Sequence, residues 1–326
     1  MNQVVIKSKV VGVDIGIDKT VFAIVDVRGN ILAEGGFPTI DYLDISQYVQ
    51  KLTDCIVELV EANGGYEQVR SVGISSPSAN NLTGCIENAA NLPWKGIIPV
   101  ANMLRDQLGL AVAIANNAHV TALGESVYGN AHGMRDFILI TLGHGLGSCI
   151  FSNGKVYLGH DGFAGEVGHT CFKTGGRLCG CGKRGCLEAY VGSKGIVKTA
   201  EKLLAETDEP SMMRELPKLS PSVISRLCDQ GDKLAIEVYR RTGELLGAGL
   251  AGYASVLNPE AIIFTGGIPR AGKWLFDPAY ESFNRHVFHN ASGKIQFLTS
   301  ALDERIRTVL GAAVLAWNVK EYSLFK

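Results

Sequence analysis

Three cysteines lie close together in the sequence, and a histidine precedes them. Cys179, Cys181 and Cys186 are spaced as C-x-C-x4-C, and His169 stands ten residues before Cys179. Three thiolates and one imidazole complete a closed tetrahedral shell around Zn²⁺, which is typical of structural zinc. The other cysteines are scattered, so the pattern does not indicate a disulfide framework. We predict a structural zinc site here, with Cys171 as the alternative to His169 and packed free thiols as the alternative to metal binding.

Two glycine-rich turns follow apolar segments in the two halves of the chain. Asp14 and Gly16 stand in the first turn, and Gly143 and Gly145 stand in the second, after the apolar segment 137–142. Backbone N–H groups in such turns can bind phosphate, and a carboxylate at a strand end can hold Mg²⁺ through water. Most turns of this kind are structural, and neither matches the P-loop pattern. Because they occupy equivalent points of two similar halves, they predict a site for ATP and Mg²⁺.

Asparagine and glutamate side chains recur near these turns. Asn91 precedes Leu-Pro-Trp, and Asn116 and Asn117 end an apolar segment. Glu166 and Glu188 flank the cysteine cluster. Amide groups donate and accept hydrogen bonds and carboxylates accept them, so this set suits a polyol. For Asn117 alone, capping of the helix that follows it is the simpler interpretation.

Hydrophobic periodicity and turn residues predict the elements that position these side chains. The predicted strands are 10–13, 21–27, 31–34, 69–74, 111–115, 137–142, 148–152, 155–158 and 261–265. The predicted helices are 45–62, 100–108, 118–128, 236–256 and 305–322. Each half opens with strand, glycine turn, strand, tight turn and strand, so we predict an α/β protein with an internal repeat of architecture.

Composition excludes several classes of protein. The chain has 326 residues, of which 46% are hydrophobic and 19% charged, and its formal net charge is -1. Such a chain is globular rather than disordered, and it lacks the basic field that would hold nucleic acid or an anionic membrane. Because no signal peptide or membrane-spanning segment is evident, we expect a cytoplasmic protein without membrane or nucleic-acid partners.

These features together resemble the ROK family of sugar kinases and sugar-responsive repressors, and most closely its bacterial glucokinase-type members. The segments that carry the resemblance are 13–16 (VDIG), 91–94 (NLPW), 116–125 (NNAHVTALGE), 141–143 (TLG), 160–169 (HDGFAGEVGH) and 179–188. The family implies an actin/hexokinase-like fold of two RNase H-type halves with a sugar in the interdomain cleft. On this basis we expect a first domain of residues 1–117 plus 301–326 and a larger second domain of residues 118–300, which carries the zinc-binding insertion.

The resemblance also assigns roles to single residues. It implies sugar contacts at Asn91, Asn116, Glu166, His169 and Glu188, and zinc ligation at His169, Cys179, Cys181 and Cys186. It places in the nucleotide site Asp14, Gly16, Asp18, Gly143, His144, Gly145 and Gly267. The implied partners are a hexose or N-acetylhexosamine, ATP with Mg²⁺, and a second copy of the chain in a homodimer.

The chain departs from the family pattern at the positions that move the phosphoryl group. Family kinases carry Asn-Asp where this chain has Asn116 and Asn117, and that Asp takes the proton from the sugar 6-hydroxyl. An amide cannot accept this proton, and general base catalysis contributes about 10²–10⁴-fold to a typical rate. The phosphate loops differ as well, since Ile17 and Asp18 replace Gly and Thr, and His144 replaces Thr. Ser75 and Ser78 fall in a loop near the sugar that usually carries Gly.

We therefore interpret the chain as a hexose-binding protein of the glucokinase lineage whose family reaction is weak or absent. A single replacement would be compatible with deliberate inactivation, whereas changes at both phosphate loops and at the base favour natural divergence. The first alternative is an active ATP-dependent glucokinase or N-acetylhexosamine kinase. A sugar-responsive repressor is less favoured, because family repressors place a helix-turn-helix before the first strand and only about nine residues precede it here.

Overall fold

The computed structural model describes residues 7–319, and these form two compact units. Within the described range, the first unit contains residues 7–133, 158–163 and 301–319, and the second contains 134–157 and 164–300. The helix that follows Asn116 therefore groups with the first unit, whereas the sequence-based boundary at residue 117 assigns it to the second domain. The C-terminal segment from residue 301 returns to the first unit.

A mixed five-stranded sheet, ordered β3-β2-β1-β4-β8, forms the centre of the first unit. The strands β1 to β3 pair antiparallel, and β4 and β8 continue the sheet in parallel with β1. Their bounds are β1 Lys9–Ile15, β2 Lys19–Asp26, β3 Ile31–Pro38, β4 Val69–Ser76 and β8 Ala111–Asn116. The carboxyl ends of β1, β4 and β8 consequently lie at the same edge.

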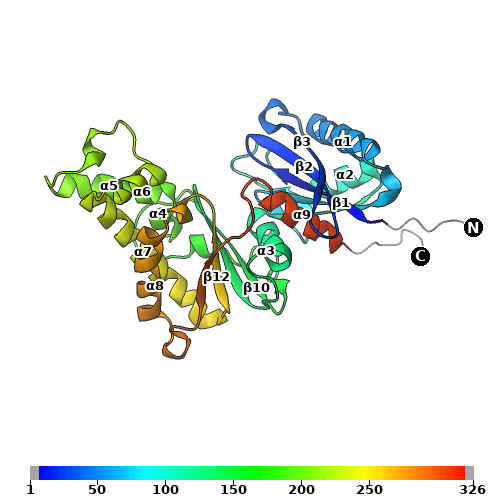
Figure 1. Cartoon of the computed structure of the whole chain (residues 1–326). Coiled ribbons are helices and arrows are strands. Elements are labelled where there is room, and N and C mark those ends of the chain that lie inside the picture. The colour runs from blue at the N-terminus through cyan, green and yellow to red at the C-terminus, as the bar shows by residue number, and fades with distance from the viewer. Residues whose placement is uncertain (1–6, 320–326) are drawn as a thin grey trace, which may run out of the picture. The chain divides into compact units, whose positions relative to one another are not determined.

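Helices cover both faces of this sheet (Figure 1). The helices α1 (Ile45–Ala62) and α2 (Val100–Leu108) pack on one face and α9 (Arg307–Trp317) on the other, while α3 (Asn117–Tyr128) packs against α9. Alternation along β1 divides its side chains between the two faces, so Val11 and Val13 join the α1 and α2 core and Val10 joins the α9 core. Three short strands, β5 (Ala79–Asn80), β6 (Cys85–Glu87) and β7 (Ile97–Ile98), form a small separate sheet.

The second unit repeats the strand order of the first. Its sheet is ordered β11-β10-β9-β12-β13, with β9, β10 and β11 antiparallel and with β12 and β13 parallel to β9. The bounds are β9 Phe137–Leu142, β10 Leu146–Ser152, β11 Lys155–Val156, β12 Ala261–Thr265 and β13 Gln296–Thr299. The identical order of the two sheets confirms the internal repeat predicted from the sequence.

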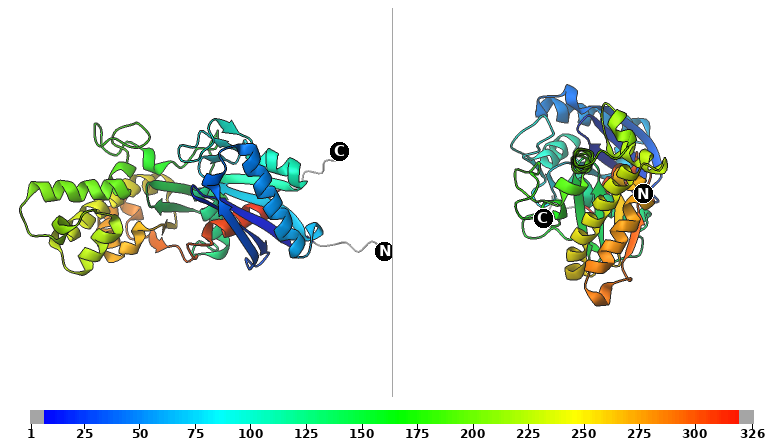
Figure 2. Two further views of the ribbon diagram at one scale, coloured as in Figure 1. Left: turned by 90° about the horizontal axis from the view of Figure 1, so that it is seen from above. Right: turned by 90° about the vertical axis from the view of Figure 1, so that its left-hand side faces the viewer.

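The helices of the second unit pack around the long helix α7. Figure 2 shows α7 (Lys233–Leu257, yellow) and α8 (Lys273–His286, orange) lying side by side. The other helices of this unit are α4 Glu188–Val191, α5 Ser193–Glu206 and α6 Pro221–Asp229. Short 3-10 helices occur throughout the chain at Thr39–Asp41, Tyr66–Gln68, Val167–His169, Met212–Glu215, Ile268–Ala271 and His289–Ala291.

Sequence-based prediction located α1, α2, β9 and β12 at their observed bounds. The predicted helix 305–322 is observed as α9, and its residues 320–322 lie outside the described residues. The helices α5, α6 and α8 and the strand β13 were not predicted. Between residues 7 and 319, no helix combines the length and the apolar character that crossing a bilayer requires.

Candidate functional site

The carboxyl ends of β1, β4 and β8 bring three of the sequence-predicted residues into one row. Asp14 of β1 pairs in register with Ser75 of β4, and Ser76 pairs with Asn116 of β8. Asn117 follows directly as the first residue of α3. In open α/β sheets, ligands bind outside the carboxyl ends of the parallel strands. This edge is therefore the candidate ligand site of the first unit.

Asn117 does not cap α3, which corrects the simpler interpretation made from the sequence. The cap is Asn116, whose side chain accepts a hydrogen bond of 3.0 Å from the N–H of Ala118. The carboxamide of Asn117 instead accepts a hydrogen bond of 2.9 Å from the Ser75 hydroxyl. Besides the second lone pair of this Oδ1, Asn117 can offer a ligand its NH2 donor.

Asp14 carries an incompletely satisfied carboxylate. Its Oδ1 is buried and has no hydrogen-bond partner. Burial raises the pKa of Asp14 from an ordinary value of 3.8 to about 6, and an interaction with the hydroxyl of Thr308 opposes this rise. A buried carboxylate oxygen without a donor matches the oxygen ligands that Mg²⁺ prefers, directly or through water.

The turn between β1 and β2 is built by Gly16, whose N–H donates to the carbonyl of Lys19 at 3.1 Å. A side chain at Gly16 would place its Cβ 2.6 Å from that same carbonyl oxygen, so only glycine fits. The side chains of Ile17 and Asp18 are exposed in this turn. Close by in sequence to Ser75, Ser78 adopts a φ of 54°, a left-handed conformation that favours glycine.

Asn91 lies exposed in the loop that leads to α2. This loop is braced by Trp94, whose ring centroid lies 4.3 Å from that of Tyr48 and whose Nε1 donates to the Tyr42 carbonyl at 3.0 Å. The Lys95 ammonium donates to three carbonyl groups of the same loop. A fixed loop can hold the Asn91 amide in one orientation.

The second glycine turn joins β9 to β10, and Glu188 at the start of α4 contacts it. The Leu146 N–H donates to Glu188 Oε2 at 2.9 Å. A Cβ at Gly145 would lie only 2.2 Å from the same oxygen, whereas a Cβ at Gly143 would meet open space. His144 is exposed at the tip of the turn. Glu188 therefore supports the glycine turn as well as being a candidate sugar ligand.

Gly267 follows β12 and begins the 3-10 helix Ile268–Ala271. A Cβ at Gly267 would meet no atom within 4 Å, which leaves its backbone open to a ligand. Its neighbour Gly266 has a φ of 99°, and a Cβ there would lie 2.3 Å from the Leu142 carbonyl oxygen at the end of β9. The pair thus keeps this strand end close to the second glycine turn.

Glu166 belongs to the same unit as His169 and Glu188 and interacts with both. Desolvation of its carboxyl group raises the pKa of Glu166, the nearby imidazole of His169 lowers it, and the negative charge of Glu188 raises it further. These electrostatic contacts place two carboxylates and one imidazole near one another. The set offers several hydrogen-bond acceptors to the hydroxyl groups of a ligand.

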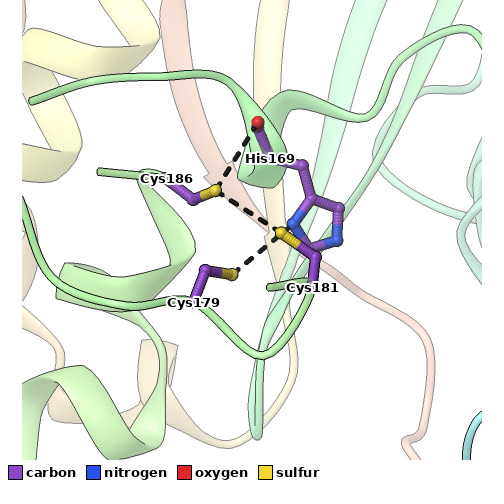
Figure 3. Close-up of side chains that lie close together, drawn as sticks. All are labelled: His169, Cys179, Cys181 and Cys186. Carbon is purple, nitrogen blue, oxygen red and sulfur yellow. Dashed lines mark hydrogen bonds between the residues drawn. The ribbon is translucent and has the colours of Figure 1, made fainter. Parts of the chain in front are cut away.

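His169, Cys179, Cys181 and Cys186 form one cluster (Figure 3). Their ligand atoms all lie within 4.8 Å of one another. The Cys181 and Cys186 Sγ atoms are 3.7 Å apart, and Cys179 Sγ is 3.8 Å from His169 Nδ1. Tetrahedral coordination with Zn–S bonds of about 2.3 Å requires sulfur atoms about 3.7 Å apart, so the cluster fits Zn²⁺. Cys171, the sequence-based alternative to His169, is not a member.

Two contacts of these sites had no signal in the sequence. Thr308 of α9 lies beside Asp14 although nearly 300 residues separate them in the chain. Cys179 Sγ donates to Glu188 Oε1 at 3.3 Å, so Glu188 joins the metal cluster to the glycine turn. Each unit thus assembles its own group of predicted residues, with Asp14, Asn116 and Asn117 in the first and Glu166, His169 and Glu188 in the second.

Comparison with known proteins assigns the family. The model of the ROK family matches residues 10–319, which is nearly the whole chain. The chain belongs to the ROK family. Among its relatives, the glucokinase of Streptomyces coelicolor is 33% identical over 84% of this chain and 87% of its own. A xylose repressor of Caldicellulosiruptor bescii is 28% identical over 94% of this chain and 79% of its own.

A solved structure agrees with the fold of this ROK protein. The ROK family glucokinase of Streptomyces griseus, in complex with glucose and AMPPNP, has 29% sequence identity and a TM-score of 0.74. The similarity covers 95% of this chain and 100% of the other. This ROK protein therefore has the sugar kinase fold of its family, and the mixed sheets described above are consistent with an actin/hexokinase-like architecture.

Proposed function

We propose that this ROK protein binds a hexose or N-acetylhexosamine and transfers phosphate from ATP to the sugar 6-hydroxyl weakly or not at all. The observation that carries the proposal is the hydrogen bond of 2.9 Å between Ser75 and the Asn117 carboxamide. This bond leaves Asn117 with a donor to offer at the strand edge. Phosphoryl transfer to a hydroxyl group needs an acceptor for its proton, and an amide does not supply one.

The residues proposed to contact the sugar keep the hydrogen-bonding groups that a sugar needs, whereas position 117 lacks a proton acceptor. They comprise Asn91, Asn116, Glu166, His169 and Glu188. Glu166 and Glu188 supply carboxylate oxygens to sugar hydroxyl groups, and the braced loop supplies the Asn91 amide. The side chain of Asn116 is less free to turn toward a sugar, because its oxygen already accepts a hydrogen bond from the Ala118 N–H at the start of α3.

For the nucleotide, we propose contacts at the two glycine turns and at Gly267. The Asp14 carboxylate is the group that fits Mg²⁺, and a pKa of about 6 keeps it mostly ionised at neutral pH. Mg²⁺ would neutralise charge on the phosphate groups. Asp18 and His144 are exposed at these turns, and the negative charge of Asp18 would oppose a phosphate group there.

At the cluster of His169 and the three cysteines we propose structural Zn²⁺. Four protein ligands close the coordination shell and leave no position for a reacting group. The ion would hold the glycine-rich segment between His169 and Cys186 in one conformation. With Zn²⁺ bound, Cys179 would be a thiolate without a proton, so its hydrogen bond to Glu188 belongs to the metal-free cluster.

The proposal is tested by replacing Asn117 with aspartate. The variant Asn117→Asp restores a proton acceptor and should raise ATP-dependent phosphorylation of its best hexose by about 10²–10⁴-fold. The measurement is a coupled assay of ADP release with glucose, mannose and N-acetylhexosamines, together with calorimetric titration of each sugar and of ATP–Mg²⁺. Asn102→Asp, at an exposed position of α2, is the matched control for an added charge.

The outcomes separate the two halves of the proposal. Sugar binding by the wild-type protein with little turnover supports both. Rapid wild-type turnover that Asn117→Asp barely improves would overturn the loss of catalysis, and the absence of binding to every sugar would overturn the proposed ligand class.

A second candidate is an active ATP-dependent glucokinase or N-acetylhexosamine kinase. It is favoured by the 33% identity to a glucokinase and by the Asp14 carboxylate at the strand edge. A sugar-responsive regulator is favoured only by the xylose repressor relatives, and the net charge of -1 argues against direct binding to DNA. A homodimer and a cytoplasmic location stay predictions, of which the first is tested by the mass of the protein in solution.

A further inference from the structure

Cys171 lies outside the metal cluster but directly faces one of its members. An isolated antiparallel β-bridge pairs Cys171 with Cys186. On one side of the pair, the Phe172 N–H donates to the Gly185 carbonyl at 2.8 Å, and on the other the Leu187 N–H donates to the Thr170 carbonyl at 3.2 Å. Because the hydrogen bonds flank the two cysteines, Cys171 and Cys186 are a non-hydrogen-bonded pair.

This type of pair brings two side chains close together. The Cα atoms of a non-hydrogen-bonded pair are about 4.5 Å apart, and both side chains project from the same face of the ladder. Disulfides form between residues whose Cα atoms are about 4.4–6.8 Å apart. The backbone therefore already holds Cys171 and Cys186 within the range of a disulfide.

The two cysteines differ in their surroundings. Cys171 is exposed and is not one of the four grouped ligands, so it is accessible to an oxidant. Cys186 is 1% exposed, and its Sγ lies 3.7 Å from that of Cys181 within the cluster. A Cβ at position 185 would lie 3.4 Å from the Cys171 Sγ, so the thiol reaches across to the strand that carries Cys186.

We propose that Cys171 and Cys186 are a reversible disulfide site, formed by oxidation with a peroxide, which withdraws a ligand from the metal cluster. The inference goes beyond the proposed sugar-binding function and rests on the metal cluster alone. Cys171 attacks the peroxide O–O bond, which gives a cysteine sulfenic acid and one molecule of water or alcohol. Cys186 then attacks the Cys171 sulfur, the S–S bond forms, and the sulfenic oxygen leaves as water. Two thiols lose two electrons and two protons, and the peroxide takes them up.

Oxidation has a defined consequence for metal binding. A disulfide sulfur carries no negative charge, whereas the thiolate is the form of cysteine that binds metal. The cluster would keep His169, Cys179 and Cys181, one ligand fewer than a closed zinc shell requires. The ion should therefore be released, and reduction of the disulfide should restore its binding.

The test compares the zinc-loaded wild-type protein with Cys171→Ser during titration with hydrogen peroxide. Zinc release is followed with a chromogenic chelator, and disulfides are located by differential alkylation and peptide mass mapping. Cys55→Ser, in α1 of the other unit, is the control for removal of a partly exposed thiol elsewhere. We expect the wild-type protein and Cys55→Ser to form a Cys171–Cys186 linkage as zinc is released, and Cys171→Ser to release zinc at least about tenfold more slowly.

Three results would overturn the proposal. The first is equal zinc release from Cys171→Ser and the wild-type protein. The second is a Cys181–Cys186 linkage in place of Cys171–Cys186. The third is the absence of any linkage at Cys171 when the metal-free protein is oxidised in the same way, a measurement that requires no bound zinc. Calorimetric sugar titration of the unoxidised protein is independent of all three, so failure here and failure of the proposed function are distinguishable.

Discussion

Asp14 shows how a single buried carboxyl group couples the ligand site to stability. Its pKa rises from 3.8 to about 6 on folding because burial disfavours the charged form. Between these two pH values the folded state binds more protons than the unfolded state, so stability falls as the pH rises through this range. The shift of about two units corresponds to about 3 kcal/mol of stability that is present below pH 4 and lost above pH 6.

We expect Asp14→Asn to remove this dependence, because an amide does not ionise. The variant should be close to the wild-type protein in stability at pH 4 and more stable at pH 8, by as much as about 3 kcal/mol. Urea unfolding of both proteins at the two pH values measures the difference. A stability difference that does not change between pH 4 and pH 8 would show that Asp14 is not the titrating group.

Gly145 and Gly143 allow a second comparison at the scale of single residues. A Cβ at Gly145 would displace the Glu188 carboxylate, which is the flexible end of a side chain, so the cost in stability should stay below about 1 kcal/mol. Displacing a charged hydrogen-bond acceptor should lower the affinity for a sugar by about tenfold or more. Calorimetric titration of Gly145→Ala and of Gly143→Ala tests this, and equal affinities of the two variants would contradict the role given to Glu188.

At the scale of elements, the close approach of α7 and α8 depends on two glycines one helical turn apart. A Cβ at Gly243 would lie 2.6 Å from the Leu275 carbonyl oxygen, and a Cβ at Gly247 would lie 2.1 Å from that of Ala279. The backbone of α8 therefore packs in direct contact with α7 at Gly243 and Gly247. Any side chain there must push the two helices apart.

A third glycine of α7, Gly252, is exposed and serves as the control for a change at Gly247. Gly247→Ala should destabilise the protein by about 1–3 kcal/mol, because the added methyl group overpacks the α7–α8 interface. Gly252→Ala, on the exposed face of the same helix, should stabilise it by about 0.5–1 kcal/mol, because alanine loses less backbone entropy than glycine. Chemical denaturation of both variants gives the two values. Stabilisation of the protein by both changes would indicate that helix propensity outweighs packing at Gly247.

At the scale of the whole molecule, the first unit is completed by a segment from the far end of the chain. The carbonyl oxygens of Val309 and Ala312 in α9 would lie 2.3 Å from a Cβ at Gly12 and 1.9 Å from one at Gly73. The helix thus packs backbone to backbone on β1 and β4. Val10, Ala23 and Val25 of the sheet are buried in the same cluster as α9.

We expect a chain that ends at Ser300 to lose the folded first unit, since this apolar face of its sheet would be exposed to water. The second unit should keep its own core. Differential scanning calorimetry and amide hydrogen exchange measure this, with a chain that ends at Val319 as the control that retains every described residue. Full protection of β1 and β4 in the shorter chain would contradict the expectation.

Sequence patterns predicted what depends on neighbours along the chain. The amphipathic periods of α1 and α2 and the continuous apolar runs of β9 and β12 are local signals, and their bounds were predicted as observed. The helix α8 was not predicted, because Pro278 interrupts its pattern, and β13 was missed because this short edge strand has only two apolar residues, Phe297 and Leu298. The grouping of His169 with Cys179, Cys181 and Cys186 was predicted from their spacing alone, since the four residues are close in sequence.

The sequence by itself determined the repeated strand pattern, the grouping of His169 with the three cysteines, and the absence of a carboxylate at position 117. Tertiary structure decided how these groups are used. It bonds Ser75 to Asn117, places Thr308 beside Asp14, joins Glu188 to Cys179 and sets Cys171 opposite Cys186. Each of these contacts depends on the register of strands or on a chain reversal, and local residue preferences do not encode which distant groups will meet.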